Sequence, residues 1–213
     1  MLFIEKITSL HLDILKEIGN IGAGNAATAL STLLNKKIEM NVPNVRIVSF
    51  DEMMEMAGGA ENVVAGVFLR IEGDAPGSMF FILSLKQAAA FIKRMIGDLE
   101  FTFENPPYNE LALSALQELG NILSGSYLSS LSDFTNLCLY PSVPALSIDM
   151  VGAIISCGLI ELSQVSDYAI VVETALNEDD LLASDGVKGH FFLLPDPDSL
   201  LTIFKSLGVA EDD

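Results

Sequence analysis

The chain has 213 residues, of which 50% are hydrophobic, and a formal net charge of −18. The length suits one large domain or two closely packed halves, and the apolar content argues against extensive disorder. A strongly negative field repels phosphate backbones and anionic lipid headgroups, so we expect neither nucleic acid nor a membrane surface as a partner. A partner with a local basic face complements this charge better, although the acidity could also serve only to keep the protein in solution.

Sequence signals for export, metal binding and nucleotide binding are missing. No apolar run reaches the ~18 residues that span a bilayer, and the N-terminus does not have the basic and apolar regions of a signal peptide. We therefore expect a cytoplasmic protein. With two histidines, two cysteines and no Walker or GxGxxG loop, we also expect that the chain holds no metal or organic cofactor of its own.

The first half of the chain predicts a long helix, two short strands, a short helix, a hairpin and a closing helix. Apolar residues recur every three to four positions in the long helix, Pro43 separates the short strands, and Gly97 stops the last helix. Three glycines, Gly19, Gly22 and Gly24, each cost the long helix about 1 kcal/mol relative to alanine, which suggests that another backbone, or a loop of a partner, approaches closely. These elements are expected over residues 10–34, 37–42, 45–50, 50–57, 63–71, 78–83 and 85–96.

The second half repeats this order of elements. The motif Glu-x-Gly-Asn-Ile begins at Glu17 and again at Glu118, which are 101 positions apart (118 − 17). Pro43 and Pro144 have the same separation (144 − 43). The second set of elements is expected over residues 108–134, 137–140, 146–148, 149–163, 168–175, 190–194 and 198–207.

An internal duplication of this kind predicts an α+β fold. We expect a single domain, residues 1–213, made of two repeats over about 8–100 and 106–209. The hairpins of the two repeats would join into one antiparallel sheet with the helices packed on it. A pseudo-twofold axis would then place the two long helices, which carry the repeated motif, in equivalent positions.

The repeated glutamate and asparagine are the candidate functional residues. Glu17 and Asn20, like Glu118 and Asn121, are three positions apart and therefore share one face of their helix. A single pair of this kind is more often only a solvated helix face, but its recurrence in both repeats argues for a function. Asparagine is a mediocre helix former, so its retention needs a cause, which could instead be an internal hydrogen bond to the backbone.

The chemistry open to such a pair is narrow. A carboxamide can donate to and accept from one water at once, and so can orient that water for attack on phosphorus, as a glutamine does in GTPases. An ionised glutamate only accepts hydrogen bonds and could hold a lysine of a partner. The pair therefore suits a protein that assists hydrolysis of a phosphoryl group carried by another molecule, which could also supply the metal ion.

These residues resemble the signature of the CheC/CheX/FliY family of chemotaxis phosphatases. The family's paired [Asp/Ser]-x-x-x-Glu-x-x-Asn pattern is matched from Asp13 to Asn20 and from Ser114 to Asn121. Both sites are present, whereas CheX typically has one, and the chain is too short for the further C-terminal domain of FliY, so the CheC branch is the most similar. The similarity covers essentially the whole chain and includes residues 17–24, 49–52, 77–81, 118–122 and 139–143.

The resemblance implies a cytoplasmic phosphatase that acts on the aspartyl phosphate of the response regulator CheY. By analogy with the family, Asn20 and Asn121 would orient the attacking water. Glu17 and Glu118 would bind CheY beside the phosphoryl group, at its lysine. The Mg²⁺ would be the ion that CheY itself holds.

The resemblance also implies further contacts with partners. Asp13 and Ser114, at the first position of the signature, would support docking of CheY. Family members bind the receptor deamidase CheD, and the apolar segment 149–164 is the candidate surface for it, with Asp149 as a helix cap or as a contact to a basic residue. A simple core helix is the alternative for this segment. We expect a monomer, because the internal pseudo-dimer reduces the need for a real one.

Two other functions stay open. The chain could be an adaptor that binds CheD or CheY at its Glu/Asn sites without catalysis, or a structural component of the flagellar switch, as FliY is in part. The retained asparagine favours an enzyme, because a docking site would tolerate other polar residues. The expected lack of a C-terminal switch domain argues against the structural component.

Overall fold

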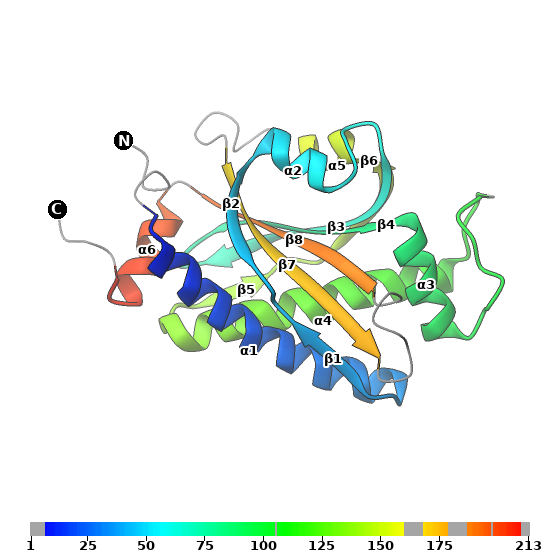
Figure 1. Cartoon of the computed structure of the whole chain (residues 1–213), viewed down its shortest axis with the longest axis horizontal. Coiled ribbons are helices and arrows are strands. Elements are labelled where there is room, and N and C mark those ends of the chain that lie inside the picture. The colour runs from blue at the N-terminus through cyan, green and yellow to red at the C-terminus, as the bar shows by residue number, and fades with distance from the viewer. Residues whose placement is uncertain (1–6, 105, 160–167, 179–186, 197, 210–213) are drawn as a thin grey trace.

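One antiparallel sheet of eight strands forms the centre of the molecule (Figure 1). The computed structural model describes residues 7–104, 106–159, 168–178, 187–196 and 198–209. The strands are β1 (Ile38–Asn41), β2 (Val45–Ser49), β3 (Val63–Gly73), β4 (Gly77–Ser84), β5 (Leu139–Pro141), β6 (Ala145–Met150), β7 (Tyr168–Glu178) and β8 (Val187–Pro195).

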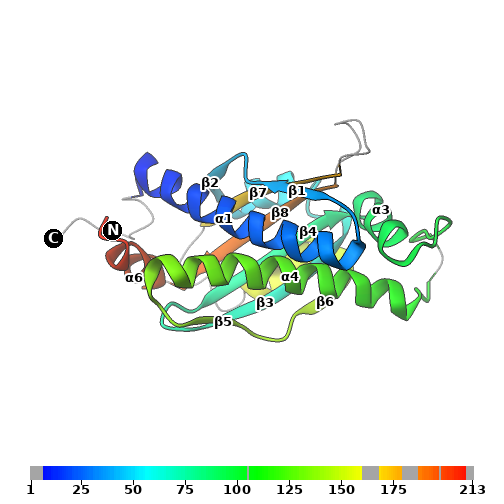
Figure 2. The same cartoon turned by 90° about the horizontal axis from the view of Figure 1, so that it is seen from below.

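The helices lie on both faces of this sheet. The two long helices run side by side in opposite directions on one face, with α3 and α6 at the two ends of this layer (Figure 2). The short helices α2 and α5 lie on the other face (Figure 1). This arrangement confirms the predicted α+β fold with an antiparallel sheet and two long helices packed on it. The helices are α1 (Ser9–Leu34), α2 (Phe50–Met56), α3 (Leu85–Ile96), α4 (Glu110–Thr135), α5 (Val151–Leu159) and α6 (Ser199–Ser206).

The order of the strands shows how the two halves of the chain are joined. The strands follow the order β1-β7-β8-β4-β3-β5, while β2 also pairs with β7 and β6 also pairs with β3. The central pairing is between β4 and β8, where Phe80 lies opposite Phe192. Each half therefore adds its two short strands to the hairpin of the other half. The period-two pattern predicted the strands but carries no information on this exchange of partners.

Two apolar layers hold the helices on the sheet. The long helices turn one stripe inward, and its members bury nearly all of their surface, with exposed fractions of 0–8%. Burial of one such side chain contributes about 1.5–3 kcal/mol. Representative residues of this layer are Leu15, Ile18, Leu119 and Leu123. The layer under α2 and α5 includes Phe80, Phe192, Val151 and Ile155.

The two long helices contact each other closely at Gly22. A Cβ atom on Gly22 would lie 2.9 Å from Cδ1 and 3.0 Å from Cα of Tyr127 on α4, so only glycine permits this approach. The Tyr127 hydroxyl shares a hydrogen bond of 2.9 Å with the Thr174 hydroxyl on β7. Burial raises the pKa of Tyr127 to about 12, so the phenol stays neutral and acts as a structural link between α4 and the sheet.

A second close contact fixes α4 on the sheet. A Cβ atom on Gly120 would lie 2.6 Å from Cγ1 of Val67 on β3. Internal packing therefore explains Gly22, where a backbone approaches as the sequence suggested, and also Gly120, where the neighbour is a side chain.

The ends of several elements differ from the predicted ones. Helix α4 begins at Glu110, two residues later than expected, because the Asn109 side chain accepts the Leu111 N–H at 2.8 Å and caps the helix. Strand β7 continues to Glu178, three residues beyond the expected end, because it pairs there with β1, Ile38 lying opposite Glu178. Strand β8 begins at Val187, three residues before the expected start at His190, and residues 179–186 lie outside the described part.

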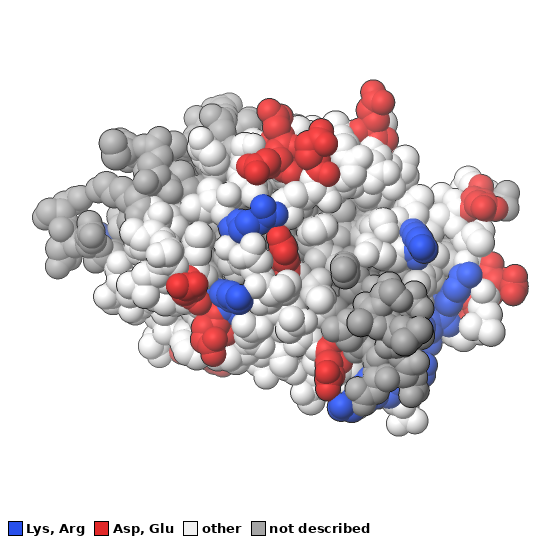
Figure 3. Space-filling model, viewed as in Figure 1, with Lys and Arg blue, Asp and Glu red and all other residues white. Residues whose placement is uncertain are grey.

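Acidic side chains gather over α2 on the face shown in Figure 3, where the sequence has Asp51, Glu52 and Glu55. Lys and Arg side chains are fewer and scattered on this face. No helix in the described part of the chain is both long enough and apolar enough to cross a membrane.

Gly120→Ala is expected to destabilise the fold by about 1–3 kcal/mol, because the added methyl group overlaps Val67 in a filled core. Equilibrium unfolding in urea measures this change. Gly125→Ala is the matched control, since a Cβ atom there meets no other part of the chain within 4 Å. Equal stability of Gly120→Ala and the wild type would show that α4 does not pack on β3 as described.

Candidate functional site

In the first Glu/Asn pair, Glu17 lies on the outer side of α1, whereas Asn20 lies at the side of the helix next to the break between β1 and β2. Leu15 and Ile18 point into the core, and this fixes the intervening residues on the opposite side of the helix. Asp13 and Glu17 are exposed, whereas Asn20 is half-buried. The structure therefore brings the three signature residues of the first repeat onto one face, as predicted from their spacing.

Asn20 is held by the break between β1 and β2. Its Oδ1 accepts the backbone N–H of Val42 at 2.9 Å. Val42 is 1% exposed and is followed by Pro43, which has no N–H, so the strand ends here and the Val42 N–H needs a side-chain partner. Asn20 supplies that partner and ties α1 to the sheet edge. In the first repeat, a hydrogen bond to the backbone therefore accounts for the retained asparagine. Pro43 is the sequence signal that could have pointed to this bond.

The second pair lies on the outer side of α4 in a different environment. Ser114, Glu118 and Asn121 are all exposed. Asn121 makes no hydrogen bond within the described part of the chain, so its carboxamide keeps its donors and its acceptor free. A hydrogen bond to the backbone therefore does not account for the asparagine of the second repeat.

The break between β5 and β6 is held by other residues. Ser142 forms two hydrogen bonds with the backbone of Arg70 on β3, one from its N–H at 2.8 Å and one to its hydroxyl at 2.9 Å. The Gln117 amide donates to the Pro144 carbonyl at 2.8 Å. Val143, the counterpart of Val42, turns out to solvent and is 85% exposed. The two sites occupy equivalent helix positions, but the Asn20 side chain is hydrogen-bonded to the backbone and the Asn121 side chain is not.

The asparagine of the second site is able to orient a water. Its carboxamide can donate to and accept from a single water at the same time, and Glu118 one turn earlier presents a carboxylate to solvent. At the first site, the Asn20 oxygen already accepts one hydrogen bond, and only the NH₂ group is fully available. Among the described residues, no three His, Cys, Asp or Glu side chains come together as a possible metal site.

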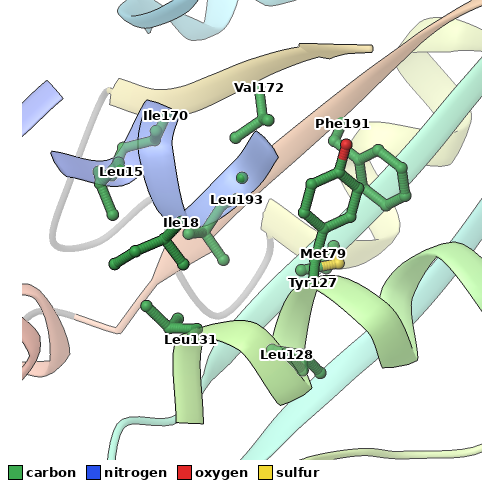
Figure 4. Close-up of a pocket in the computed structure, with 11 residues that line it drawn as sticks. Leu15, Ile18, Met79, Tyr127, Leu128, Leu131, Ile170, Val172, Phe191 and Leu193 are labelled. Carbon is green, nitrogen blue, oxygen red and sulfur yellow. The ribbon is translucent and has the colours of Figure 1, made fainter. Parts of the chain in front are cut away.

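A cavity lies behind the sites, between α1, α4 and the sheet (Figure 4). Its volume is about 40 Å³, and its lining is almost entirely apolar apart from the Tyr127 hydroxyl. A charged phosphoryl group would lose its hydration there without replacement. The chemistry suggested by the Glu/Asn pairs therefore belongs to the outer surface of the helices, where a protein substrate has access. The residues lining the cavity include Leu15, Ile18, Met79, Leu128, Ile170, Val172 and Phe191.

The segment around Asp149 differs from its predicted structure. Asp149 lies in β6 opposite Val64, rather than at the start of a helix, and its Oδ1 accepts the N–H of the following residue at 2.8 Å. Helix α5 begins at Val151, and Val151, Ile154 and Ile155 are 0–5% exposed. These residues fill the core under α5, so the alternative of a core helix holds for them and they do not form an exposed apolar surface for a partner. Residues 160–164 lie outside the described part.

Asp149 itself remains accessible. It is exposed, and the neighbouring Met150 is 45% exposed. The edge of the sheet at β6 therefore presents one carboxylate and one apolar side chain to solvent.

Comparison with known proteins places the chain in a family. The CheY-P phosphatase CheC of Bacillus subtilis (strain 168) is 52% identical over 200 residues, which cover 94% of this chain and 95% of that protein. The chain belongs to the CheC-like family. The model of this family matches residues 10–47 and 111–148, which contain both Glu/Asn pairs and both prolines of the strand breaks.

Solved structures agree with the CheC-like fold. Thermotoga maritima FliY superposes with a TM-score of 0.73 at 24% identity, over 95% of this chain and 98% of the other. A chain of the CheX-CheY-BeF3-Mg+2 complex from Borrelia burgdorferi superposes with a TM-score of 0.51 at 15% identity, over 82% of this chain and 96% of the other. At these identities the similarity establishes the shared fold.

Asn20→Ala is expected to lower the free energy of unfolding of this CheC-like protein by about 1–3 kcal/mol, because the buried Val42 N–H loses the side-chain acceptor that Asn20 supplies. Asn121→Ala should change it by less than about 0.5 kcal/mol, since the exposed carboxamide has no partner to lose. Urea unfolding of the two variants gives both values. If the two asparagines proved equally dispensable, the hydrogen bond to Val42 would not be contributing as described.

Proposed function

We propose that this CheC-like protein is a CheY-P phosphatase, a hydrolase that accelerates loss of the aspartyl phosphate from the response regulator CheY. The observation that carries the proposal is the exposed Glu118/Asn121 pair, with its carboxamide free of internal hydrogen bonds. The 52% identity to a CheY-P phosphatase over nearly the whole chain supports the same activity. The protein acts in the cytoplasm, where its substrate is, and as a monomer.

Each asparagine assists the reaction by orienting a water in line with the phosphorus atom of CheY-P. The water oxygen bonds to phosphorus while the bond from phosphorus to the aspartyl oxygen breaks. The aspartate leaves as a carboxylate and the phosphate is released, with the water's protons passing to phosphate and solvent. Glu17 and Glu118 hold the lysine beside the phosphoryl group of CheY, and CheY supplies the Mg²⁺. Asp13 and Ser114, one turn earlier on the same helix faces, support docking.

The two sites contribute unequally to this activity. A water-orienting amide has to donate and accept together. Asn121 has both functions free, whereas the oxygen of Asn20 is partly engaged by the Val42 N–H. The second site therefore carries the larger share of the phosphatase activity, and the first site combines a weaker catalytic role with a structural one.

Asn121→Ala is expected to reduce kcat/KM for CheY-P by a larger factor than Asn20→Ala does, roughly tenfold or more, in line with the loss of a positioned catalytic group. Asn121→Asp should be as inactive as the alanine variant, because a carboxylate cannot donate and repels the phosphoryl oxygens. Decay of phosphorylated CheY, followed by phosphate release, measures each value. If Asn20→Ala lost more kcat/KM than Asn121→Ala at equal folded fraction, the first site would be the more active one, contrary to this proposal.

An adaptor for CheD is a second function, and the exposed Asp149 and Met150 at the edge of β6 favour it. Asp149→Ala is expected to weaken CheD binding about tenfold, the effect of losing one contact at the centre of an interface. Hydrolysis of CheY-P in the absence of CheD should be unaffected, because Asp149 belongs to neither Glu/Asn pair. Titration calorimetry with CheD tests the first point, and unchanged affinity would move the CheD surface elsewhere.

A further inference from the structure

Gly24 and Gly125 follow the two asparagines at the same distance, four residues later in each helix. Residues four apart lie on the same side of a helix, one turn further along. Each of the two sites is therefore a row of three positions, with glutamate, asparagine and glycine in that order. The glycine at the third position is identical in the two repeats, as the glutamate and the asparagine are.

Internal packing does not explain these glycines. Among the described residues, a Cβ atom added at Gly24 or Gly125 would meet nothing within 4 Å beyond the neighbouring backbone of its own helix. Gly22 and Gly120 differ in this respect. A Cβ atom on Gly22 would lie 2.9 Å from Tyr127, and a Cβ atom on Gly120 would lie 2.6 Å from Val67.

Backbone conformation does not explain them either. Gly24 and Gly125 lie in the interior of α1 and α4, and neither has a positive φ. Any residue could adopt these angles, and nearly all would form a more stable helix than glycine does. Both glycines thus weaken the helix at positions where the fold makes no use of them.

We infer that Gly24 and Gly125 keep the surface beside Asn20 and Asn121 low enough for the main chain of the protein substrate to reach the asparagines. This inference rests on the proposed function. An asparagine side chain is short, so it can reach a phosphoryl group inside another protein only if the helix itself comes close. A side chain one turn away on the same side would hold the partner off.

The hollowed surface beyond Gly24 fits this role. Gly24, Ala27, Thr28 and Ser31 line an open depression between α1 and the edge strand β1. These small side chains leave a hollow on the C-terminal side of Asn20, and Glu17 lies on the N-terminal side of Asn20. The two glycines are therefore specificity-determining residues, because they decide how closely a partner can approach.

A size series at Gly125 tests the inference, with hydrolysis of phosphorylated CheY by the full chain as the assay. Gly125→Ala should raise the Tm, because alanine is the better helix former, and raise the KM for CheY-P several-fold. Gly125→Gln should raise the KM by roughly tenfold or more, because it displaces the partner further. The kcat of each variant should stay within about twofold of the wild type, since Glu118 and Asn121 are unchanged.

Affinity for CheY carrying Mg²⁺ and BeF₃⁻ gives a readout that does not depend on turnover. It should fall in step with the rise in KM. The double variant Gly24→Gln/Gly125→Gln should lose more affinity than either single variant, because both sites are then obstructed. Ser156→Ala is the control for helix stability, since Ser156 is an exposed residue of α5, on the other face of the sheet, whose hydroxyl donates to the Gly152 carbonyl of its own helix. It should raise the Tm without changing the KM.

Three results separate the possible failures. A wild-type protein that does not accelerate CheY-P hydrolysis would refute the proposed function itself. An active wild type that loses kcat in Asn121→Ala, but keeps its KM and affinity in both Gly125 variants, would refute only the role of the glycines. A Gly125→Gln variant that unfolds at a lower Tm than the wild type would show that the glycine serves the fold, and would also overturn the inference.

Discussion

The close packing of the two long helices on one sheet determines most of what this molecule can present to a partner. At Gly22 the backbone of α1 comes against Tyr127, and at Gly120 the backbone of α4 comes against Val67. These contacts fix the rotation of each helix about its axis. Once Leu15 and Ile18 face the core, Glu17 has to face outward and Asn20 comes to lie beside the strand break at Val42. In the second copy, Glu118 and Asn121 both face solvent. The sites are thus a consequence of how the helices are packed.

The two repeats use different ways to end the strand pair beside the site. In the first, the Asn20 side chain satisfies the Val42 N–H in front of Pro43. In the second, Ser142 and Gln117 hold the break, and Val143 turns out to solvent. A duplicated sequence therefore gives one asparagine that is partly used by the fold and one that is free. Duplication of this kind permits one copy to support the structure while the other keeps its full chemical capacity.

Much of the fold could be predicted from the sequence, because periodicity and turn residues act locally. The long helices, the hairpins and the repeat offset of 101 positions all follow from such local patterns. The exchange of β1 and β2 to β7 could not be predicted, since a strand pattern does not name its partner. The burial of α5 was ambiguous for a related reason: an apolar helix looks the same in sequence whether it packs in the core or lies exposed.

The spacing of the residues predicted that each glutamate lies next to its asparagine. It did not predict that the two asparagines would differ in their hydrogen bonding. Three-residue spacing places Glu17 with Asn20 and Glu118 with Asn121. In the structure both glutamates and Asn121 are exposed, whereas Asn20 is half-buried. The bond from Val42 to Asn20 joins residues 22 positions apart in the chain. A long-range contact of this kind depends on where α1 lies on the sheet, so the motif alone could not reveal it.

The central claim is that two carboxamides on the surface of the helices drive hydrolysis of a phosphoryl group on another protein. The most direct measurement is the rate of CheY-P decay with the double variant Asn20→Ala/Asn121→Ala, compared with the wild type at equal folded concentration. The account predicts that the acceleration falls by roughly 10²-fold or more, while CheY-P still binds. Decay at the wild-type rate with both carboxamides removed would contradict it.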